Sequence, residues 1–405
     1  MPGPDTYQGM QVACAARQAQ IRGVRSGSGR SLSESTHMID LSHIVKKGVY
    51  GAERRNFRDK LAQREHYLRL DLNENLVGLS REQLESLLST IRPETLSAYP
   101  DLSRIYRRMA THVGVGEDQI VLTNGSDMGI KTLFDVCIGK GDHIVVHQPF
   151  FLMYAHYAEF FEATLDRVPV REEDWRPDAQ AMLARVNSRT KMVVVESPNG
   201  NLGTSLTPQE TEHMAAELAR RNVLLVIDEA YLSCERDHSD HLPLLERHGN
   251  VVLVRTLSKA NGLAGARLGV LVSTPAIARE LYKVRSLYEI SALTAIVAEW
   301  HLDHPEVLED YRNTVRAGKR YLAEQCARLG IGFKDTQANF VLLELDPGQE
   351  TELCASRLKE QGILIGMPFA LAQLFGWARI TVGDPTHCAR LIGAVEALQR
   401  DRTPA

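Results

Sequence analysis

Five apolar runs in the central part of the chain each pass directly into a string of polar residues. Candidate strands span residues 119–122, 143–147, 191–195, 223–227, 251–254 and 268–272, and the first five of them carry such a string. Because apolar runs alternate with helical patterns, the sequence predicts βαβ units and a mainly parallel sheet. Ligands bind beyond the carboxyl ends of the strands in an open α/β sheet. The five polar strings are therefore expected to converge on one crevice.

The fifth strand leads to Thr256, Ser258 and Lys259, and Arg267 follows eight residues after the lysine. A lysine just past a buried strand is held partly out of water, and a neutral amine can attack an aldehyde to form a Schiff base. Arginine is a rigid two-pronged donor suited to phosphate. A lone Ser-Lys pair would indicate only a surface lysine before a loop. The whole string favours a site for pyridoxal 5'-phosphate, which requires an imine-forming lysine beside a phosphate cradle.

Gly125, Ser126 and Asp127 follow the first strand and open a helical pattern at residues 128–136. The unpaired N–H groups and the dipole at a helix start suit a phosphate group. An ordinary N-cap by Ser126 or Asp127 is the alternative for these residues alone. Together with Arg267 they favour phosphate binding.

Asp228 ends the most hydrophobic candidate strand. A partly buried carboxylate needs a cationic partner, and the protonated pyridine nitrogen of the cofactor is one, which keeps the ring an electron sink. Tyr231 is placed to bond the phenolic oxygen of the ring, and Phe151, just past the second strand, is placed to stack on it. The alternatives are that Asp228 caps a strand-to-helix turn and that Phe151 is an ordinary core residue.

The pattern changes after about residue 295. A helical stretch at 293–328, strands at 339–343 and 379–382 and a helix near 350–361 predict a smaller α+β domain, completed by N-terminal residues near 40–100. Arg379 opens the last strand beside Trp377 and Ile380. Because arginine suits planar, two-pronged recognition, we expect it to bind a substrate carboxylate rather than to form a surface salt bridge.

These motifs resemble those of the class I and II aminotransferases, which belong to fold type I of the pyridoxal-phosphate enzymes, and most closely the histidinol-phosphate aminotransferase branch. The resemblance covers about residues 70–400 and rests on these strings: Asn73-Glu74-Asn75, Tyr99-Pro100-Asp101, Gly125-Ser126-Asp127, Asp228-Glu229-Ala230-Tyr231, Ser258-Lys259 with Gly265 and Arg267, and Arg379-Ile380-Thr381-Val382-Gly383. It implies a large domain with a mainly parallel seven-stranded sheet, a smaller α+β domain, and a homodimer with the active site at the subunit interface.

The resemblance also implies a role for each site residue. Lys259 would form the aldimine with the cofactor and shuttle the proton, Asp228 would pair with the pyridine nitrogen, and Tyr231 would bond the ring oxygen. Arg379 and Asn75 would bind the substrate. The phosphate and ring would be held by the following residues: Gly125, Ser126, Asp127, Phe151, Thr256, Ser258 and Arg267, with Tyr99 reaching the phosphate from the second subunit.

Two positions depart from the family pattern. Gly200 stands where the family's ring-oxygen-binding asparagine is expected, so that Asn199 or Asn201 must substitute or Tyr231 acts alone. Gly366 stands where the histidinol-phosphate branch carries a second arginine that grips the substrate phosphate. Histidinol phosphate is therefore not the expected substrate. If the pocket geometry otherwise matches the family, a Gly366→Arg change is expected to improve the binding of phosphate-bearing substrates.

The sequence thus predicts an aminotransferase that moves an amino group between an amino acid, or an amino acid-like anion, and a 2-oxo acid. One alternative is another reaction of the same cofactor, by a decarboxylase, lyase or oxidase, which the altered string at 197–203 keeps open. The other is a regulator that binds the cofactor without turnover. The presence of Lys259, Asp228 and Arg379 argues against a regulator without turnover.

Composition excludes several other classes. The chain has 405 residues, a net charge of −4 and no apolar stretch of membrane-spanning length, so neither nucleic acid nor membrane is an expected partner. Its six cysteines are scattered without metal-ligand spacing, which predicts no metal site and a reducing, cytoplasmic location.

The length predicts two domains and an extension. We expect an N-terminal extension at 1–37, an arm and part of the small domain at 38–100, a large cofactor-binding domain at 101–295, and a linking helix and small domain at 296–405. Residues 1–37 are rich in Arg and Ser and poor in acids, as in a transit peptide. Because the segment lacks a clear amphipathic pattern, we prefer two other interpretations. It is either a disordered tail or upstream sequence included by an early start codon, with Met38 as the alternative start.

Overall fold

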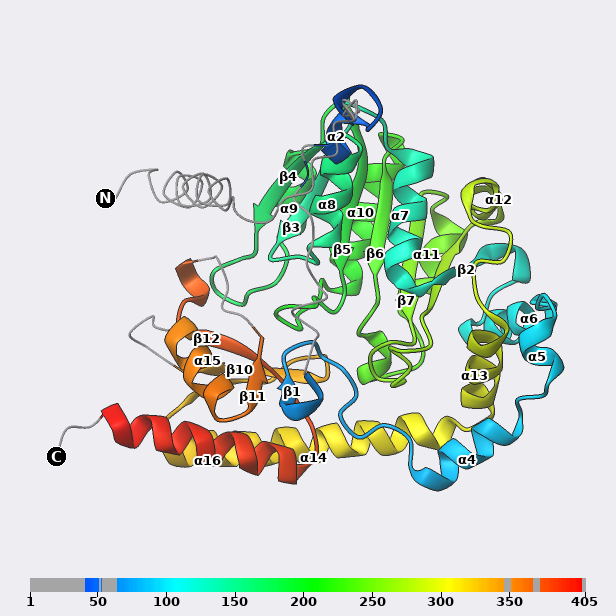
Figure 1. The fold of residues 1–405 in the computed structure, drawn as a ribbon. Helices are drawn as coiled ribbons and strands as arrows, with labels where there is room; N and C mark the ends of the chain where they lie inside the picture. Colours follow the sequence, from blue (N-terminus) through cyan, green and yellow to red (C-terminus); the bar gives the residue numbers. More distant parts are fainter. Residues whose placement is uncertain (1–40, 51, 53–63, 346–350, 367–371, 403–405) are drawn as a thin grey trace, which may run out of the picture. The chain divides into compact units, whose positions relative to one another are not determined.

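The computed structural model describes residues 41–50, 52, 64–345, 351–366 and 372–402 (Figure 1). The chain divides into two compact units, Met1–Ile44 and Val45–Ala405. In the first unit the described part is the short 3-10 helix Leu41–His43, and the predicted extension at 1–37 lies outside the described residues. All that follows concerns the second unit.

A seven-stranded sheet forms the centre of the large domain. Its strands lie in the order β2 (Ile120–Asn124), β8 (Leu268–Ser273), β7 (Val251–Thr256), β6 (Leu224–Asp228), β5 (Thr190–Glu196), β3 (His143–Gln148) and β4 (Thr164–Pro169). Strand β8 is antiparallel to both of its neighbours, and the other pairs are parallel. The predicted mainly parallel seven-stranded sheet is confirmed. Sequence analysis missed the edge strand β4, whose residues are exposed or half-exposed except for Val168 and include Asp166 and Arg167.

Alternate residues of the central strands face two separate apolar cores. Val193, Leu225 and Leu253 belong to one core, whereas Val194 and Val226 belong to the other. The first core is covered by α6 (Ser103–Val113), α9 (Ala179–Ala184), α10 (Pro208–Arg220), α11 (Leu242–Arg247) and α13 (Ala292–Asp303), and the second by α7 (Gly125–Cys137), α8 (Met153–Phe160) and α12 (Pro275–Val284). The central strands are almost continuously apolar because the sheet is buried on both faces.

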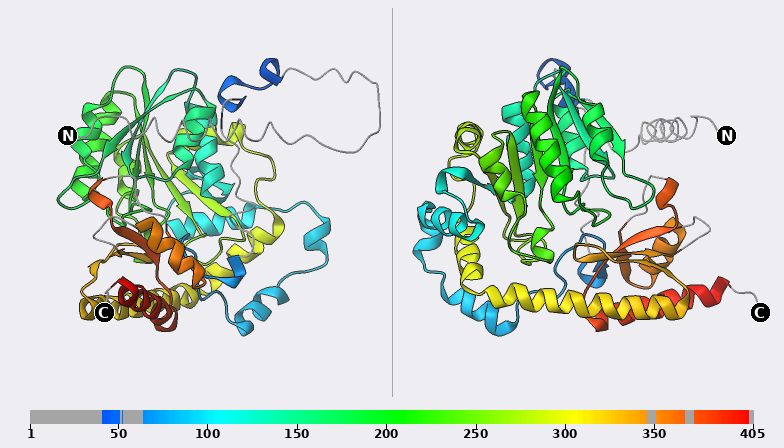
Figure 2. Two further views of the ribbon diagram at one scale, coloured as in Figure 1. Left: turned by 60° about the vertical axis from the view of Figure 1, so that its left-hand side comes forward. Right: turned by 180° about the vertical axis from the view of Figure 1, so that it is seen from behind.

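The smaller domain is built on two further sheets and its own core. An antiparallel sheet has the order β12 (Trp377–Thr381), β10 (Phe340–Glu344), β9 (Gly332–Lys334), and β1 (Leu68–Leu70) pairs in parallel with β11 (Ile363–Ile365). Helices α14 (Pro305–Leu329) and α16 (Pro385–Arg402) lie side by side under these strands, with α15 (Thr351–Glu360) beside them (Figure 2). Residues from both ends of the second unit therefore build this domain.

The helical stretch predicted at 293–328 is two helices, not one. Helix α13 ends at Asp303 and α14 begins at Pro305, with His304 in a non-helical conformation between them. Proline lacks the N–H that would continue the first helix but fits the first position of the next one.

The remaining described elements are short connectors: α2 (Lys47–Tyr50), η2 (Arg64–His66), α4 (Arg81–Ser89), α5 (Glu94–Ser97), η3 (Glu117–Gln119), η4 (Leu232–Cys234) and η5 (Ala372–Leu374). None of the helices within the described ranges is both long and apolar enough to cross a membrane.

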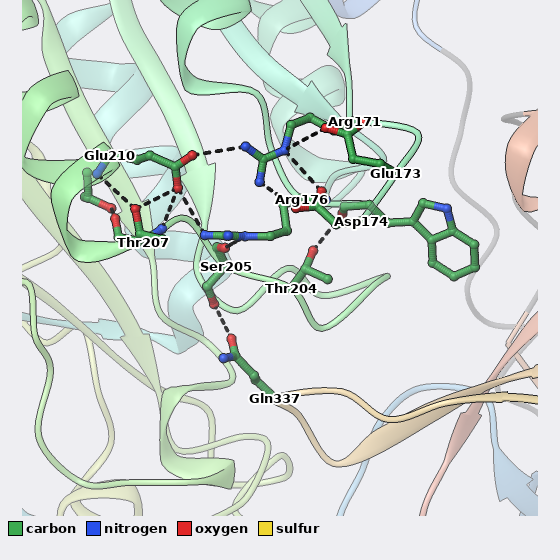
Figure 3. Close-up of polar contacts among 11 residues, drawn as sticks. Arg171, Glu173, Asp174, Arg176, Thr204, Ser205, Thr207, Glu210 and Gln337 are labelled. Carbon is green, nitrogen blue, oxygen red and sulfur yellow. Dashed lines mark hydrogen bonds and ion pairs between the residues drawn. The ribbon is translucent and has the colours of Figure 1, made fainter.

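Polar contacts hold the loop that follows β5 (Figure 3). Arg176 Nε donates to the carbonyl of Ser205 (2.7 Å), and Arg176 also pairs with Glu210 (3.0 Å). Ser205 Oγ donates to Gln337 Oε1 (2.6 Å), a residue of the segment between β9 and β10. These contacts hold the chain just after the 197–203 string. The start of that string follows the carboxyl end of β5, where the functional site lies.

Candidate active site

A cavity of about 460 Å³ lies at the carboxyl ends of the large sheet's strands. All five polar strings that were predicted to converge contribute to its lining, together with Leu72, Arg267 and Arg379. The strand ends bring together residues that are far apart in the sequence. This convergence is the direct consequence of the parallel strand order.

The amino end of α7 and Arg267 form one end of the cavity. Ser126 and Asp127 lie in the first turn of α7 and line the cavity. A Cβ on Gly125, whose φ is +76°, would lie within 2.3 Å of Arg267 Nη2. Glycine is therefore what lets the guanidinium reach the start of the helix, where it adds positive charge to unpaired N–H groups.

Two hydroxyls complete this end of the cavity. Thr256 Oγ1 donates to Ser258 Oγ (2.9 Å), which in turn accepts from Arg267 Nη1 (3.4 Å). Both hydroxyls line the cavity. An arginine, two hydroxyls and a helix start make up a donor set that suits a phosphate dianion.

Lys259 lies beside this donor set and reaches into the cavity. Its Nζ donates to the carbonyl of Leu72 (2.9 Å) and lies 5.4 Å from the centre of the Tyr231 ring. The amine thus stands at the junction of the two domains, since Leu72 follows β1.

Asp228 is buried at the end of β6. Burial raises the pKa of its carboxyl to about 6, although the carboxylate accepts hydrogen bonds from Tyr154 Oη (2.9 Å) and the backbone N–H of Ala230 (3.1 Å). The described residues offer Asp228 no ion pair. A cationic group in the cavity would therefore stabilise the ionised carboxylate.

Tyr231 is positioned by Asn73, whose role sequence analysis missed. Asn73 Nδ2 donates to Tyr231 Oη (2.9 Å), and the Asn73 backbone N–H donates to Thr381 Oγ1 (2.9 Å). Since Oη accepts the amide hydrogen, its own hydrogen is free to donate into the cavity. Asn73 is fully buried with φ of +56°, a conformation that asparagine tolerates better than most residues.

Arg379 enters the cavity from β12 of the small domain. Its Nη1 donates to the carbonyl of Gly200 (2.7 Å) and its Nη2 to the carbonyl of Asp71 (2.8 Å), whereas Nε is buried without a partner among the described residues. The guanidinium is thus oriented by backbone carbonyls that carry no formal charge. Its positive charge remains available for an anion.

The two asparagines proposed to replace a side chain at position 200 differ in their placement. Asn199 is fully buried: its Nδ2 donates to the carbonyl of Pro149 (2.8 Å), and its Oδ1 accepts from the N–H groups of Asn201 (2.7 Å) and Leu202 (2.8 Å). It therefore shapes the loop and does not line the cavity. Asn201 does line the cavity, where its Oδ1 lies 3.4 Å from Arg379 Nη1.

Asn75 and Tyr99 lie away from the cavity in this chain. Asn75 Oδ1 accepts from the N–H groups of Val77 (2.9 Å) and Gly78 (3.0 Å), and so it closes a turn. Tyr99 is 80% exposed and stacks on Tyr288, with ring centres 4.4 Å apart. A contact between Tyr99 and a cofactor would require a second subunit.

Glu196 and His147 were not singled out from the sequence, although both lie near the ends of strands that lead to the site. Glu196 lines the cavity and is buried, and its backbone N–H donates to His147 Nε2 (2.9 Å). Phe151, which was predicted, lines the cavity as well, and its backbone N–H donates to Glu196 Oε1. The signal available in the sequence was a glutamate at the end of an otherwise apolar strand.

The residues present fit pyridoxal 5'-phosphate. The cradle that a Cβ at position 125 would fill suits the phosphate, Asp228 offers a buried carboxylate to a pyridinium nitrogen, and Lys259 presents an amine to the same cavity. When bound, this cofactor supplies an electron sink for the electrons released at the α-carbon of an amine.

Comparison with known proteins decides the family. The sequence model "Aminotransferase class I and II" matches residues 65–395. The chain belongs to this family. The predicted aminotransferase activity and the predicted cofactor, pyridoxal 5'-phosphate, are confirmed by this membership.

Relatives and solved structures agree with it. The aminotransferase is 32% identical to histidinol-phosphate aminotransferase 1 of Psychrobacter arcticus over 82% of this chain and 88% of that one. It is 29% identical to histidinol-phosphate aminotransferase 2 of Carboxydothermus hydrogenoformans over 81% and 90% of the two chains. Its fold matches the histidinol-phosphate aminotransferase of Sinorhizobium meliloti in complex with pyridoxal-5'-phosphate (TM-score 0.78, 22% identity, 92% of this chain and 100% of that one). It also matches the aspartate aminotransferase of Thermus thermophilus with maleate (TM-score 0.72, 19% identity, 88% and 99%).

Proposed function

We propose that this aminotransferase acts on an amino donor with one strongly anionic group, a carboxylate or a group of similar shape, and that Arg379 binds this group. The observation that carries the proposal is the placement of Arg379, which lines the cavity together with Arg267 and is held by neutral carbonyl groups. A guanidinium with this orientation matches a planar carboxylate in two-pronged fashion.

The other cations on the cavity have different roles in this proposal. Lys259, Arg267 and Arg379 are the cations that line the cavity among the described residues. Arg267 faces the start of α7 and serves the cofactor phosphate, and Lys259 serves the chemistry. Of these three cations, the guanidinium of Arg379 thus remains for the substrate, which argues against histidinol phosphate as the preferred donor.

Lys259 would hold the cofactor through its ε-amine. The same amine would take up the α-proton of the substrate and return it to a different atom. The carbonyl of Leu72, which accepts a hydrogen bond from Nζ in the structure, orients the amine for this transfer. Asp228 keeps the ring nitrogen protonated, since a cation beside it relieves the cost of a buried carboxylate.

A homodimer with Tyr99 reaching the partner's cofactor belongs to the same proposal. Tyr99 and Leu96 are 80% and 74% exposed, and Leu287 and Tyr288 are 77% and 47% exposed. So many large apolar side chains around one stacked pair suit an interface with a second subunit. Sedimentation of the full chain tests whether it forms a dimer. Titration of the Tyr99→Ala variant with cofactor tests whether Tyr99 contributes to cofactor affinity.

We also propose a cytoplasmic location. Cys137, Cys234, Cys326 and Cys388 form no disulfide, as expected in a reducing compartment.

A panel of amino donors tests the substrate proposal. Conversion of the bound cofactor to its amine form, reversed by a 2-oxo acid, is measured for carboxylate donors, phosphonate analogues and histidinol phosphate. Carboxylate or phosphonate donors are expected to react well, and Arg379→Ala is expected to lower their kcat/KM about 10- to 100-fold. Efficient turnover of histidinol phosphate, unaffected by Arg379→Ala, would contradict the proposal.

A further inference from the structure

The carboxyl group of Glu196 occupies the space that a side chain at position 200 would fill. A Cβ built on Gly200 would lie 3.2 Å from Glu196 Oε2 and 2.9 Å from Tyr231 Cε2. Glu196 therefore lies beside the edge of the Tyr231 ring, at the place where a larger residue at position 200 would point. All three residues line the cofactor cavity.

The Glu196 carboxyl is fixed by two backbone donors. Its Oε1 accepts the N–H of Phe151, and its Oε2 accepts the N–H of Gly200 (2.7 Å). The residue is 3% exposed and stands next to Asp228, its register partner on the adjacent strand β6. A carboxyl group in this position cannot turn away into solvent and must meet whatever fills the cavity.

We propose that Glu196 is a cofactor-contacting residue: as a neutral carboxylic acid, it donates a hydrogen bond from Oε2 to the phenolic oxygen of the pyridoxal ring, beside Tyr231. The inference rests on pyridoxal phosphate binding in this cavity with its ring oxygen near Tyr231. It does not depend on which substrate the enzyme accepts.

The surroundings favour the neutral form of Glu196. Burial, and next the negative charge of Asp228, raise the pKa of Glu196 to about 8, against the two backbone donors and the more distant Arg379. His147 offers no compensating charge, because burial lowers its pKa to about 4. The titratable and charged groups around Glu196 are His147 on β3, Tyr154 on α8, Asp228 and Tyr231 at and after the end of β6, Lys259 after β7, and Arg379 on β12.

A carboxylic acid suits this position better than an amide would. The protonated Oε2 can still accept the Gly200 N–H through a lone pair while its hydrogen points into the cavity. The NH₂ group of a glutamine could donate into the cavity but could not accept the Gly200 N–H. Ionisation of Glu196 would remove the donor and place a second negative charge beside the ring oxygen.

The test is a cycle between protein and cofactor variants. Full-length wild-type protein and Glu196→Ala, both freed of cofactor, are titrated with pyridoxal 5'-phosphate and with 3-deoxypyridoxal 5'-phosphate, which lacks the phenolic oxygen. We expect Glu196→Ala to weaken binding of the natural cofactor about 10- to 100-fold at pH 7 and to leave binding of the deoxy analogue within about threefold. Equal loss for both ligands, or for neither, would overturn the proposal.

The pH dependence and a compensating pair give a second readout, which stands even where Glu196→Ala folds poorly. The absorption spectrum of bound cofactor in the wild type should change with pH around the value at which Glu196 ionises, and Glu196→Gln should lack this change. Gly200→Asn alone should lose cofactor affinity, because its Cβ would meet both Tyr231 Cε2 (2.9 Å) and Glu196 Oε2 (3.2 Å). Glu196→Ala with Gly200→Asn removes the second contact and should recover part of the lost affinity. A wild-type spectral transition that persists in Glu196→Gln would contradict the proposal.

Glu217→Gln is the matched control, because Glu217 is a half-buried glutamate of α10 that pairs with Arg220 and Arg221 and does not line the cavity. It should leave both the affinities and the spectrum unchanged. If the wild type bound pyridoxal phosphate but the Glu196 cycle gave no coupling, only this inference would fail. Absence of cofactor binding by the wild type would instead remove the basis of the proposed function.

Discussion

Gly366 lies directly against Arg379. Its N–H donates to the Arg379 carbonyl (2.9 Å), and a Cβ at position 366 would lie 2.8 Å from that carbonyl oxygen and 3.1 Å from Arg379 Nε. The missing side chain therefore leaves room for Arg379, the proposed substrate-binding residue. The expectation that Gly366→Arg improves phosphate binding does not fit this contact, because the new side chain would start inside the space of Arg379.

Gly366→Arg should lower kcat/KM for every donor, carboxylate or phosphate, by about tenfold or more, since a displaced arginine loses a charge-assisted contact. The measurement is steady-state kinetics with one donor of each type. Gly393→Ala is the control, because a Cβ at that position meets nothing within 4 Å. A gain with phosphate donors at unchanged carboxylate activity would show that Arg379 is not disturbed.

Gly125→Ala should weaken cofactor binding. The new Cβ would displace the Arg267 guanidinium from the start of α7, and a contact of this kind is worth roughly 1.5–3 kcal/mol. Isothermal titration with pyridoxal 5'-phosphate measures the loss. Gly114→Ala carries the same kind of backbone strain, with φ of +87°, but its Cβ would meet nothing within 4 Å. It should lose stability without losing affinity, and equal affinity losses in the two variants would contradict the assignment of Arg267.

Ionisation of Glu196 should destabilise the cofactor-free protein, relative to Glu196→Gln, as pH rises from about 6.5 to 8. The folded-state pKa of Glu196 is raised from 4.5 to about 8, so the folded state keeps a proton that the unfolded chain has lost, and stability falls with pH. Asp228, raised to about 6, acts below this window. His112, His143, His147 and His301, whose pKa values are lowered from 6.5, favour stability as pH rises, because the unfolded chain still binds protons at these residues near pH 6.5. They oppose the fall at the lower edge of this window, so the effect of Glu196 is measured against a variant that keeps these histidines.

Urea unfolding at pH 6.5 and 8 measures this effect. Relative to Glu196→Gln, the wild type should lose up to about 1.4 kcal/mol of unfolding free energy per pH unit. Glu196→Gln keeps the histidines and lacks the Glu196 ionisation, so the difference between the two proteins isolates Glu196. A difference that is the same at both pH values would mean that Glu196 is already ionised at pH 6.5.

The strand ends were the part of the site that the sequence predicted best. Asp228, Lys259 and Ser258 follow apolar runs, and parallel pairing alone brings such positions together. Glu196 and Asn73 were missed because their importance lies in contacts across the fold. The Glu196 carboxyl lies where a side chain at position 200 would point, and Asn73 contacts the hydroxyl of Tyr231. A local sequence pattern does not show which distant loop a side chain contacts in the folded protein.

The same limit explains the two residues that lie apart from the cavity. Asn75 stands two positions from Asn73 in one motif, but its oxygen is used by its own turn. The proposed role of Tyr99 requires a second copy of the chain, which a single sequence cannot place. Strand β4 was missed because a half-exposed edge strand mixes charged and apolar residues, and so its periodicity resembles that of a loop.

The attachment of the cofactor to Lys259 is the central claim, and chemical trapping tests it most directly. The full-length protein with bound pyridoxal phosphate is reduced with borohydride, digested, and analysed by mass spectrometry. The account predicts a phosphopyridoxyl group on the ε-amine of Lys259, and a Lys259→Ala variant that still folds but carries no such label and has no transaminase activity. A label on any other lysine, or wild-type activity in Lys259→Ala, would contradict it.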